Sequence, residues 1–183
     1  MDLTRDAAAQ ALRDIEHAGT ASRELYGYQF GGAYLIVWGL IWLVCGSLGD
    51  FLPGFARTIW STGNIVGIAA SIWLTFRLPK SNDRRYLWRG LGLMGILVFF
   101  WVAVGWVLDP TPARKLLAFS GLLTGTAYLI VGLWAGTRYL WCGVAVVGLS
   151  LIGHAFMTSH YQLWFAVACG GALILGGWWM RRA

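Results

Sequence analysis

Residues Phe30–Leu48 read FGGAYLIVWGLIWLVCGSL, and none of them carries a charged side chain. The charge-free run around them lies between Glu24 and Asp50 and holds 25 residues. A helix rises about 1.5 Å per residue, so about 20 apolar residues cross the roughly 30 Å hydrocarbon core of a bilayer. The run is continuously apolar rather than alternating, which favours a spanning helix over a barrel strand. This stretch therefore predicts an integral membrane protein.

Four further charge-free runs follow along the chain. Two of them hold 19 residues, one holds 22, and the last holds 42, which is enough for two spans. The last run is divided by the polar cluster Thr158–Gln162. We divide the chain into a leader over residues 1–29 and a transmembrane domain over residues 30–183. The pattern predicts an all-α bundle of six transmembrane helices: Phe30–Leu48, Thr58–Phe76, Leu87–Leu108, Lys115–Gly136, Tyr139–Met157 and Tyr161–Met180.

The composition excludes most soluble classes of protein. Of the 183 residues, 58% are hydrophobic and 12% are charged, whereas a soluble domain carries about 25% charged residues. The mean hydropathy of +0.62 excludes a disordered chain and argues strongly against a soluble globular enzyme.

Lys and Arg are distributed unevenly between the predicted loops. With six spans, the two termini and the second and fourth loops share one side, which holds eleven of these residues, and the other side holds three. Cytoplasmic loops hold the excess of Lys and Arg. We therefore predict a multi-pass protein of the cell inner membrane with both termini in the cytoplasm. The net charge of +6 then requires no nucleic-acid partner.

The leader carries five of the eight acidic residues and a run of strong helix formers from Ala7 to Ala18. Its apolar stripe consists mainly of alanine, so it predicts a short amphipathic helix with a weak apolar face. This helix either lies against the basic loop Arg77–Arg89 or docks a cytoplasmic partner protein. The pattern favours the first interpretation, because charge runs are usually solvated faces.

Glycine is abundant, with 25 residues, and small residues let helix backbones approach closely in lipid. Such seams serve either packing within the chain or a homo-oligomer. The outer turns and returning glycines also recur along the chain, which predicts three helical-hairpin repeats pointing the same way. The predicted seams are Gly63/Gly67, Gly121/Gly125 and Ala168/Ala172/Gly176.

Most of the 12 tryptophans lie near predicted helix ends, as is typical of the aromatic belt at a membrane surface. Three of them lie deeper, where we expect them to pack between helices: Trp38, Trp42 and Trp101.

Polar groups inside the predicted spans are few. No acidic residue lies in a span, and the three cysteines, Cys45, Cys142 and Cys169, lie in different spans without paired spacing. We therefore predict no metal site, no cofactor and no catalytic set. His154 is the one histidine within a predicted span, and it lies near the outer end of the fifth predicted helix. We expect it to lie in a low-dielectric site, uncharged, and bonded to a nearby carbonyl or hydroxyl.

Three further polar residues accompany His154. Asn64 and Ser150 lie at comparable depth, and Thr124 is nearer the middle of its helix. Polar residues in a span face the bundle interior by default. These four residues form either one polar pocket open to the outside or separate interhelical hydrogen bonds, and we favour the second.

Six spans in about 180 residues, with Gly-rich seams and outer turns such as Gly49-Asp50-x-x-Pro53 and Asp109-Pro110, resemble the small acid-resistance membrane proteins of the HdeD-like type. The resemblance covers residues 30–180 in architecture. The acidic leader and the heavy use of Trp depart from that pattern. The leader followed by residues 34–42 is more similar to other small bacterial inner-membrane proteins of unassigned function. The resemblance implies a six-helix bacterial membrane protein and indicates no ligand.

The absence of intramembrane acids, metal sets and catalytic sets favours a non-enzymatic membrane protein with a role in membrane stress, sensing or binding, whose partner is the lipid bilayer. A transporter or channel for a small neutral or lipophilic solute is the alternative, supported by the pocket residues. A membrane enzyme acting on lipid is a weaker alternative that rests on Ser159 and His160. A bundle filled by Trp, Leu and Gly would favour the first hypothesis, and a water-filled path the second.

Overall fold

The computed structural model describes residues 5–77, 92, 95, 96, 98–104, 112–157 and 159–182. Within these ranges every regular element is a helix, so the predicted all-α class is confirmed. The elements α6, η2 and α7 follow one another directly and form one continuous rod, which we call the last helix. The elements are α1 (Arg5–Phe51), the 3-10 turn η1 (Pro53–Phe55), α2 (Ala56–Arg77), α4 (Ala113–Ala135), α5 (Thr137–Phe156), α6 (Tyr161–Trp164), the π-helix η2 (Phe165–Gly170) and α7 (Gly171–Arg181).

Five helices among the described residues are long and apolar enough to cross a membrane. They coincide within a few residues with five of the predicted spans, because the charged residues that bound each run also bound each helix. The predicted span Leu87–Leu108 lies largely outside the described residues, and its described stretch 98–104 is helical. The five are Gly27–Phe51, Pro53–Arg77, Arg114–Ala135, Thr137–Phe156 and Tyr161–Arg181.

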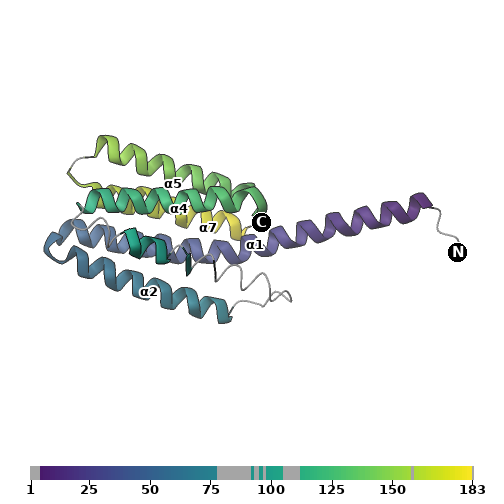
Figure 1. Cartoon of the computed structure of the whole chain (residues 1–183), viewed down its shortest axis with the longest axis horizontal. Coiled ribbons are helices and arrows are strands. Elements are labelled where there is room, and N and C mark those ends of the chain that lie inside the picture. The colour runs from purple at the N-terminus through teal and green to yellow at the C-terminus, as the bar shows by residue number, and fades with distance from the viewer. Residues whose placement is uncertain are drawn as a thin grey trace.

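The leader does not form the separate short helix that the sequence predicts. It is helical, but it belongs to the 47-residue helix α1, which continues without a break into the first apolar span. Figure 1 shows α1 running well past the end of the bundle towards the N-terminus. No proline interrupts residues 5–51, and helix formers dominate the leader, so nothing in the sequence stops the helix between the two regions. The basic loop Arg77–Arg89 lies almost wholly outside the described residues.

The closest packing in the bundle joins α1 to the last helix through glycines. A Cβ atom added to Gly39 would lie 2.7 Å from the carbonyl oxygen of Gly170, and one added to Gly32 would lie 2.6 Å from that of Gly177. Backbone therefore touches backbone along this seam, and any side chain would push the helices apart. We call this contact the α1 seam. It was not among the seams predicted from the sequence.

The predicted glycine seams also lie at helix contacts within the chain. Gly63 and Gly67 of α2 face side chains of α1, and a Cβ on Gly125 of α4 would lie 3.1 Å from the carbonyl oxygen of Gly143 in α5. Gly121 faces Ser150 of α5. The glycines whose added Cβ would meet the backbone of another helix therefore pair α1 with the last helix and α4 with α5, which are not hairpin partners of the predicted repeat.

The interior is filled with apolar side chains. Phe165, Leu173, Met180 and Val146 are fully buried, and the rings of Trp42 and Phe165 lie 4.6 Å apart. Two of the deep tryptophans bond across helices, as expected, and the third, Trp42, packs in the core. The indoles of Trp38 and Trp101 donate to the hydroxyls of Ser71 at 3.2 Å and Ser120 at 2.7 Å.

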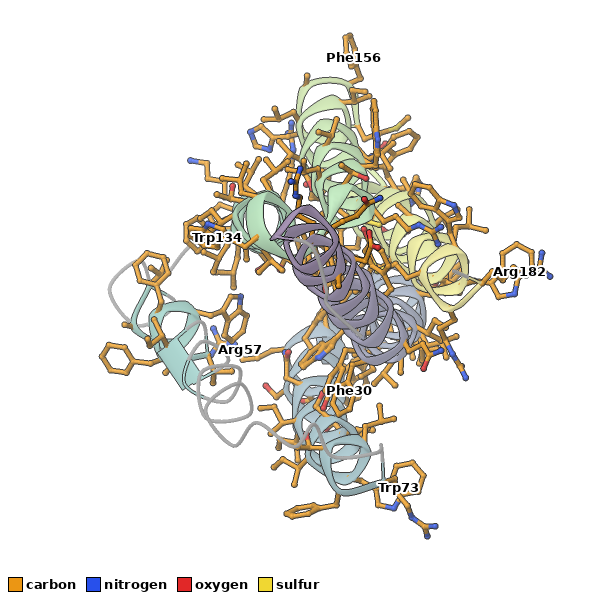
Figure 2. The ribbon with its side chains drawn as sticks, turned by 90° about the vertical axis from the view of Figure 1, so that its right-hand side faces the viewer. Phe30, Arg57, Trp73, Trp134, Phe156 and Arg182 are labelled. Carbon is orange, nitrogen blue, oxygen red and sulfur yellow. The ribbon has the colours of Figure 1, made fainter. Side chains whose placement is uncertain are left out.

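The outer surface of the helices is also apolar. Figure 2 shows Trp73, Trp134 and Phe156 pointing away from the ribbon, and these side chains are 58%, 82% and 76% exposed. Two tryptophans near helix ends also bond between helices. Trp164 donates to the carbonyl oxygen of Leu149 at 3.0 Å, and Trp60 donates to Gln162 at 3.3 Å.

Candidate functional site

The bundle has two ends, which we name by one residue each. At the Asp50 end, α1 and α5 finish while α2, α4 and the last helix begin. At the Arg138 end, α4 finishes, α5 begins and the last helix terminates, and α1 extends past it (Figure 1).

The predicted pocket residues are spread over separate contacts. The side-chain amide of Asn64 donates to the carbonyl oxygen of Trp60 in its own helix at 2.8 Å. Ser150 is buried, with its hydroxyl 3.5 Å from the sulfur of Cys169. Thr124 is half-buried on α4. In the part of the chain that the structure describes, no hydrogen bond joins any of these residues to another or to His154, so a shared pocket stays a prediction.

His154 is exposed, not buried as its position in a span suggested. It occupies the last turn of α5, where its imidazole meets the ring of Tyr161 edge to face, with centroids 6.2 Å apart. The expected low-dielectric setting was wrong, because the side chain is exposed in the last turn of its helix. Its backbone carbonyl, rather than its side chain, makes the bond that links α5 to α4.

Arg114 supplies that bond from the first turn of α4. One terminal nitrogen of its guanidinium, Nη2, donates to the carbonyl oxygen of His154. The guanidinium carbon lies 6.0 Å from the centre of the Tyr161 ring, so the cation stands near the aromatic group. Arg114 thereby joins α4, α5 and the last helix at one point.

Two polar atoms of this contact remain unused. Among the described residues, Arg114 Nε and the Tyr161 hydroxyl are the buried side-chain nitrogen and oxygen atoms that lack a hydrogen-bond partner. Tyr161 is 3% exposed. Native structures pair the great majority of buried polar atoms, because an unpaired one loses its hydration without compensation. Two such atoms therefore belong to residues of one contact, and each can donate a hydrogen bond.

An Asp–His pair lies at the same end. The imidazole Nδ1 of His160 donates to Oδ2 of Asp50 at 2.7 Å, and their side chains are 75% and 10% exposed. Asp50 therefore pairs with His160 at this end of the bundle. Asp109 lies outside the described residues.

The Asp50–His160 pair can orient an imidazole, as carboxylates do for histidines that act as bases. A hydrolytic site also needs a nucleophile joined to that imidazole. Ser159 is exposed beside His160, and within the described residues no hydrogen bond connects its hydroxyl to the ring. The pair therefore ties α1 to the last helix.

The described residues contain no group of three or more His, Cys, Asp or Glu side chains that could hold a metal ion. The three cysteines are unpaired and buried. Cys45 and Cys142 lie beneath Gly63 and Gly176 respectively, where a sulfur fills the space against a glycine.

The Arg138 end has a similar arginine in a different setting. Arg138 stands over the rings of Tyr28 and Trp179, 5.2 Å and 5.1 Å from their centres, and donates to the carbonyl oxygen of Trp179 at 2.8 Å. The buried hydroxyl of Tyr139 donates to the carbonyl oxygen of Gly27 at 2.7 Å. The buried phenol of Tyr139, whose ring lies 5.8 Å from that of Tyr28, therefore has a partner.

Arg114 and Tyr161 were not identified from the sequence as site residues. Arg114 was counted only among the three basic residues of the outer side, and Tyr161 only as the start of a span. A usable signal was present, since a lone arginine directly before a charge-free run must place its cation at the helix end. Which aromatic ring it meets depends on how α4 packs against the last helix.

No protein-family model, curated protein or solved structure matches the chain.

Proposed function

We propose that the chain is a six-span protein of the inner membrane, with both termini in the cytoplasm, and that it serves as a non-enzymatic binding or sensing component whose working surface is the Asp50 end. Five apolar helices and the helical stretch 98–104 support the span count. The excess of Lys and Arg supports the orientation, because the Asp50 end belongs to the side with three of the 14. The threefold repeat and a homo-oligomer stay predictions.

The observation that carries this proposal is the close packing between the described helices. Leu35, Phe165 and Leu173 fill the space between α1, α5 and the last helix, and they are at most 1% exposed. The glycine contacts of the α1 seam bring backbones together on either side of them. A conduit would need a water-filled path through these layers, so the packing supports a binding role over transport.

The polar chemistry gathers where a membrane protein meets water. Arg114, His154 and His160 lie in first or last turns of their helices, or directly beside them, while the helix sides carry exposed apolar residues such as Ile65 and Leu133. Apolar sides suit contact with lipid tails, and polar ends suit the headgroup region. A ligand in water or in the headgroup layer therefore meets its polar partners at the Asp50 end.

The position of the leader favours the second interpretation, in which it docks a cytoplasmic partner protein. In this orientation residues 5–26 form a helical arm that extends from the bundle into the cytoplasm (Figure 1). An arm that points away from the bundle supports docking of a cytoplasmic protein.

Reporter fusions test the orientation. Fusions after Lys80 and after Ala183 are expected to report cytoplasm, and a fusion after Phe55 is expected to report the outside. The reverse pattern at Phe55 would contradict the proposed function, because it would turn the Asp50 end towards the cytoplasm.

Liposome permeability tests the choice between binding and transport. Purified full-length protein in liposomes is expected to leave the rate of glycerol-driven swelling equal to that of empty liposomes. A protein-dependent increase in that rate would favour the transporter, and a heat-denatured sample reconstituted in parallel controls for leaks.

A further inference from the structure

The unpaired donors at the Asp50 end indicate which class of ligand could bind them. Arg114 Nε is an N–H that can only donate, and the Tyr161 phenol can also donate, so a group with two acceptor oxygens can satisfy both. Charged acceptors form the stronger bonds with guanidinium groups, and arginine favours carboxylate and phosphate in particular. The two donors come from α4 and the last helix, so one ligand would bridge the two helices.

The arginine is already held in position. Its Nη2 atom is fixed on the backbone of His154, and its planar guanidinium stands near the Tyr161 ring. Because the guanidinium is planar and rigid, a hydrogen bond that holds one of its nitrogens also limits the direction of its other N–H groups, including Nε. Little conformational entropy is then lost when a ligand accepts from Nε.

The electrostatics of this end favour an anion. Arg114 occupies the first turn of the 23-residue helix α4, where the helix dipole is positive, and exposed Lys115 adds a second cation. Asp50 is the one acidic residue at this end within the described ranges, and its carboxylate already accepts from His160. A negative ligand therefore meets a surplus of positive charge.

The depth of the contact selects between carboxylate and phosphate. Arg114 and Tyr161 each begin a helix that is long and apolar enough to span a bilayer. In a spanning orientation both therefore lie at the level of the headgroups, where phosphate is the abundant oxyanion.

We infer that the Asp50 end binds a phosphate-type oxyanion between Arg114 and Tyr161, either the headgroup of an outer-leaflet phospholipid or a free phosphate. The ligand oxygens accept from Arg114 Nε and from the Tyr161 hydroxyl. This inference rests on the proposed function for the side of the membrane on which the ligand is met. The contact chemistry itself depends only on the two residues.

Thermal unfolding of the full-length protein in a phosphorus-free maltoside detergent tests the site. The probes are inorganic phosphate, matched against chloride at constant ionic strength, and short-chain phosphatidylglycerol added to the micelles. The wild-type midpoint is expected to rise with at least one probe and to saturate. A rise with phosphate identifies the free anion, and a rise with the lipid alone identifies the headgroup.

Tyr161→Phe is the decisive variant, because it removes one oxygen and keeps the ring under Arg114. The half-saturating concentration of the probe is expected to increase about 10-fold or more, as for the loss of a hydrogen bond to a charged group. Arg114→Gln is expected to abolish the rise. Lys115→Gln, which removes the neighbouring exposed cation, is the matched control and should retain saturation within about threefold.

Two results would overturn the inference. One is a wild-type midpoint that neither probe raises, which leaves ordered water as the partner of both donors. The other is a Tyr161→Phe variant with the wild-type half-saturation, which indicates general lipid or salt stabilisation. If reporter fusions reverse while the Tyr161→Phe effect holds, the proposed function fails and the site survives. If the fusions agree and the Tyr161→Phe effect is absent, the site alone fails.

Discussion

Each end of the bundle has an arginine near a tyrosine ring, but the two ends differ in the hydrogen bonds of their buried phenols. Arg138 stands over Tyr28 at 5.2 Å, and Arg114 stands over Tyr161 at 6.0 Å. Each arginine also donates to a backbone carbonyl near the C-terminus of a neighbouring helix. At both ends, therefore, a cation fastens helices together over an aromatic ring.

The difference lies in the polar atoms left over. The buried Tyr139 hydroxyl at the Arg138 end donates to the backbone of Gly27. The buried Tyr161 hydroxyl and Arg114 Nε at the Asp50 end have no partner in the described part of the chain. The two contacts thus differ: the buried phenol at the Arg138 end is paired, and the one at the Asp50 end has a donor that the proposed oxyanion would satisfy.

The largest expected effect comes from breaking the α1 seam, on which both ends depend. In Gly39→Ala the new Cβ would lie 2.7 Å from the Gly170 carbonyl oxygen and 3.0 Å from the Ile174 backbone nitrogen, so only movement of a helix can relieve the overlap. Overpacking of this kind costs about 1–3 kcal/mol. The thermal midpoint in detergent is expected to fall by about 2–12 °C.

Gly148→Ala is the matched control for that substitution. Gly148 is also in a helix, but a Cβ placed there meets no atom within 4 Å. Alanine favours helix by up to about 1 kcal/mol, so the midpoint is expected to stay level or to rise. Equal losses in the two variants would show that the α1 seam is not a tight contact.

The next effect separates the Arg138 end from the Asp50 end. Tyr139→Phe removes a buried hydroxyl and leaves the buried Gly27 carbonyl without that donor. The Gly27 carbonyl also lies within helix α1, so the net loss is about 0.5–1.5 kcal/mol, and the thermal midpoint is expected to fall by about 1–6 °C. A midpoint equal to wild type would show that the Arg138 end is not the complete joint described above.

A smaller effect is expected from the Asp50–His160 pair. His160 is 75% exposed, and exposed ion pairs contribute about 0.2–1 kcal/mol. His160→Gln and Asp50→Asn are each expected to lower the midpoint by less than about 4 °C, and the double variant should lower it no more than either single one. Additive losses would indicate that the two residues act separately.

The helices could be predicted from the sequence because their limits are set by nearby residues. Charged residues such as Arg57 and Arg77 bound α2 on both sides, and their cost in lipid fixes where a span can end. The glycines of the α1 seam carried a signal that went unused. Gly32, Gly39 and Gly46 recur every seven residues, which places them on one face of a helix.

The site could be predicted only in part, because it depends on which helices meet. His154 was correctly placed near a helix end, but its outward direction follows from the packing of α5 against α4. The Arg114–Tyr161 contact joins residues far apart in the chain, and no periodicity reports such a contact. The prediction of a separate short leader helix was wrong for a simpler reason, since no residue before Gly27 stops α1.

The central claim is that the Tyr161 hydroxyl has no partner until a ligand supplies one. The most direct test is the thermal midpoint of Tyr161→Phe beside that of wild type, both in maltoside, with a phosphorus assay confirming that neither sample carries lipid. Removing an unpaired buried hydroxyl is nearly neutral or stabilising. The midpoint of Tyr161→Phe is therefore expected to equal or exceed that of wild type. A fall as large as that of Tyr139→Phe would contradict the claim, because it would mean that the hydroxyl is already paired.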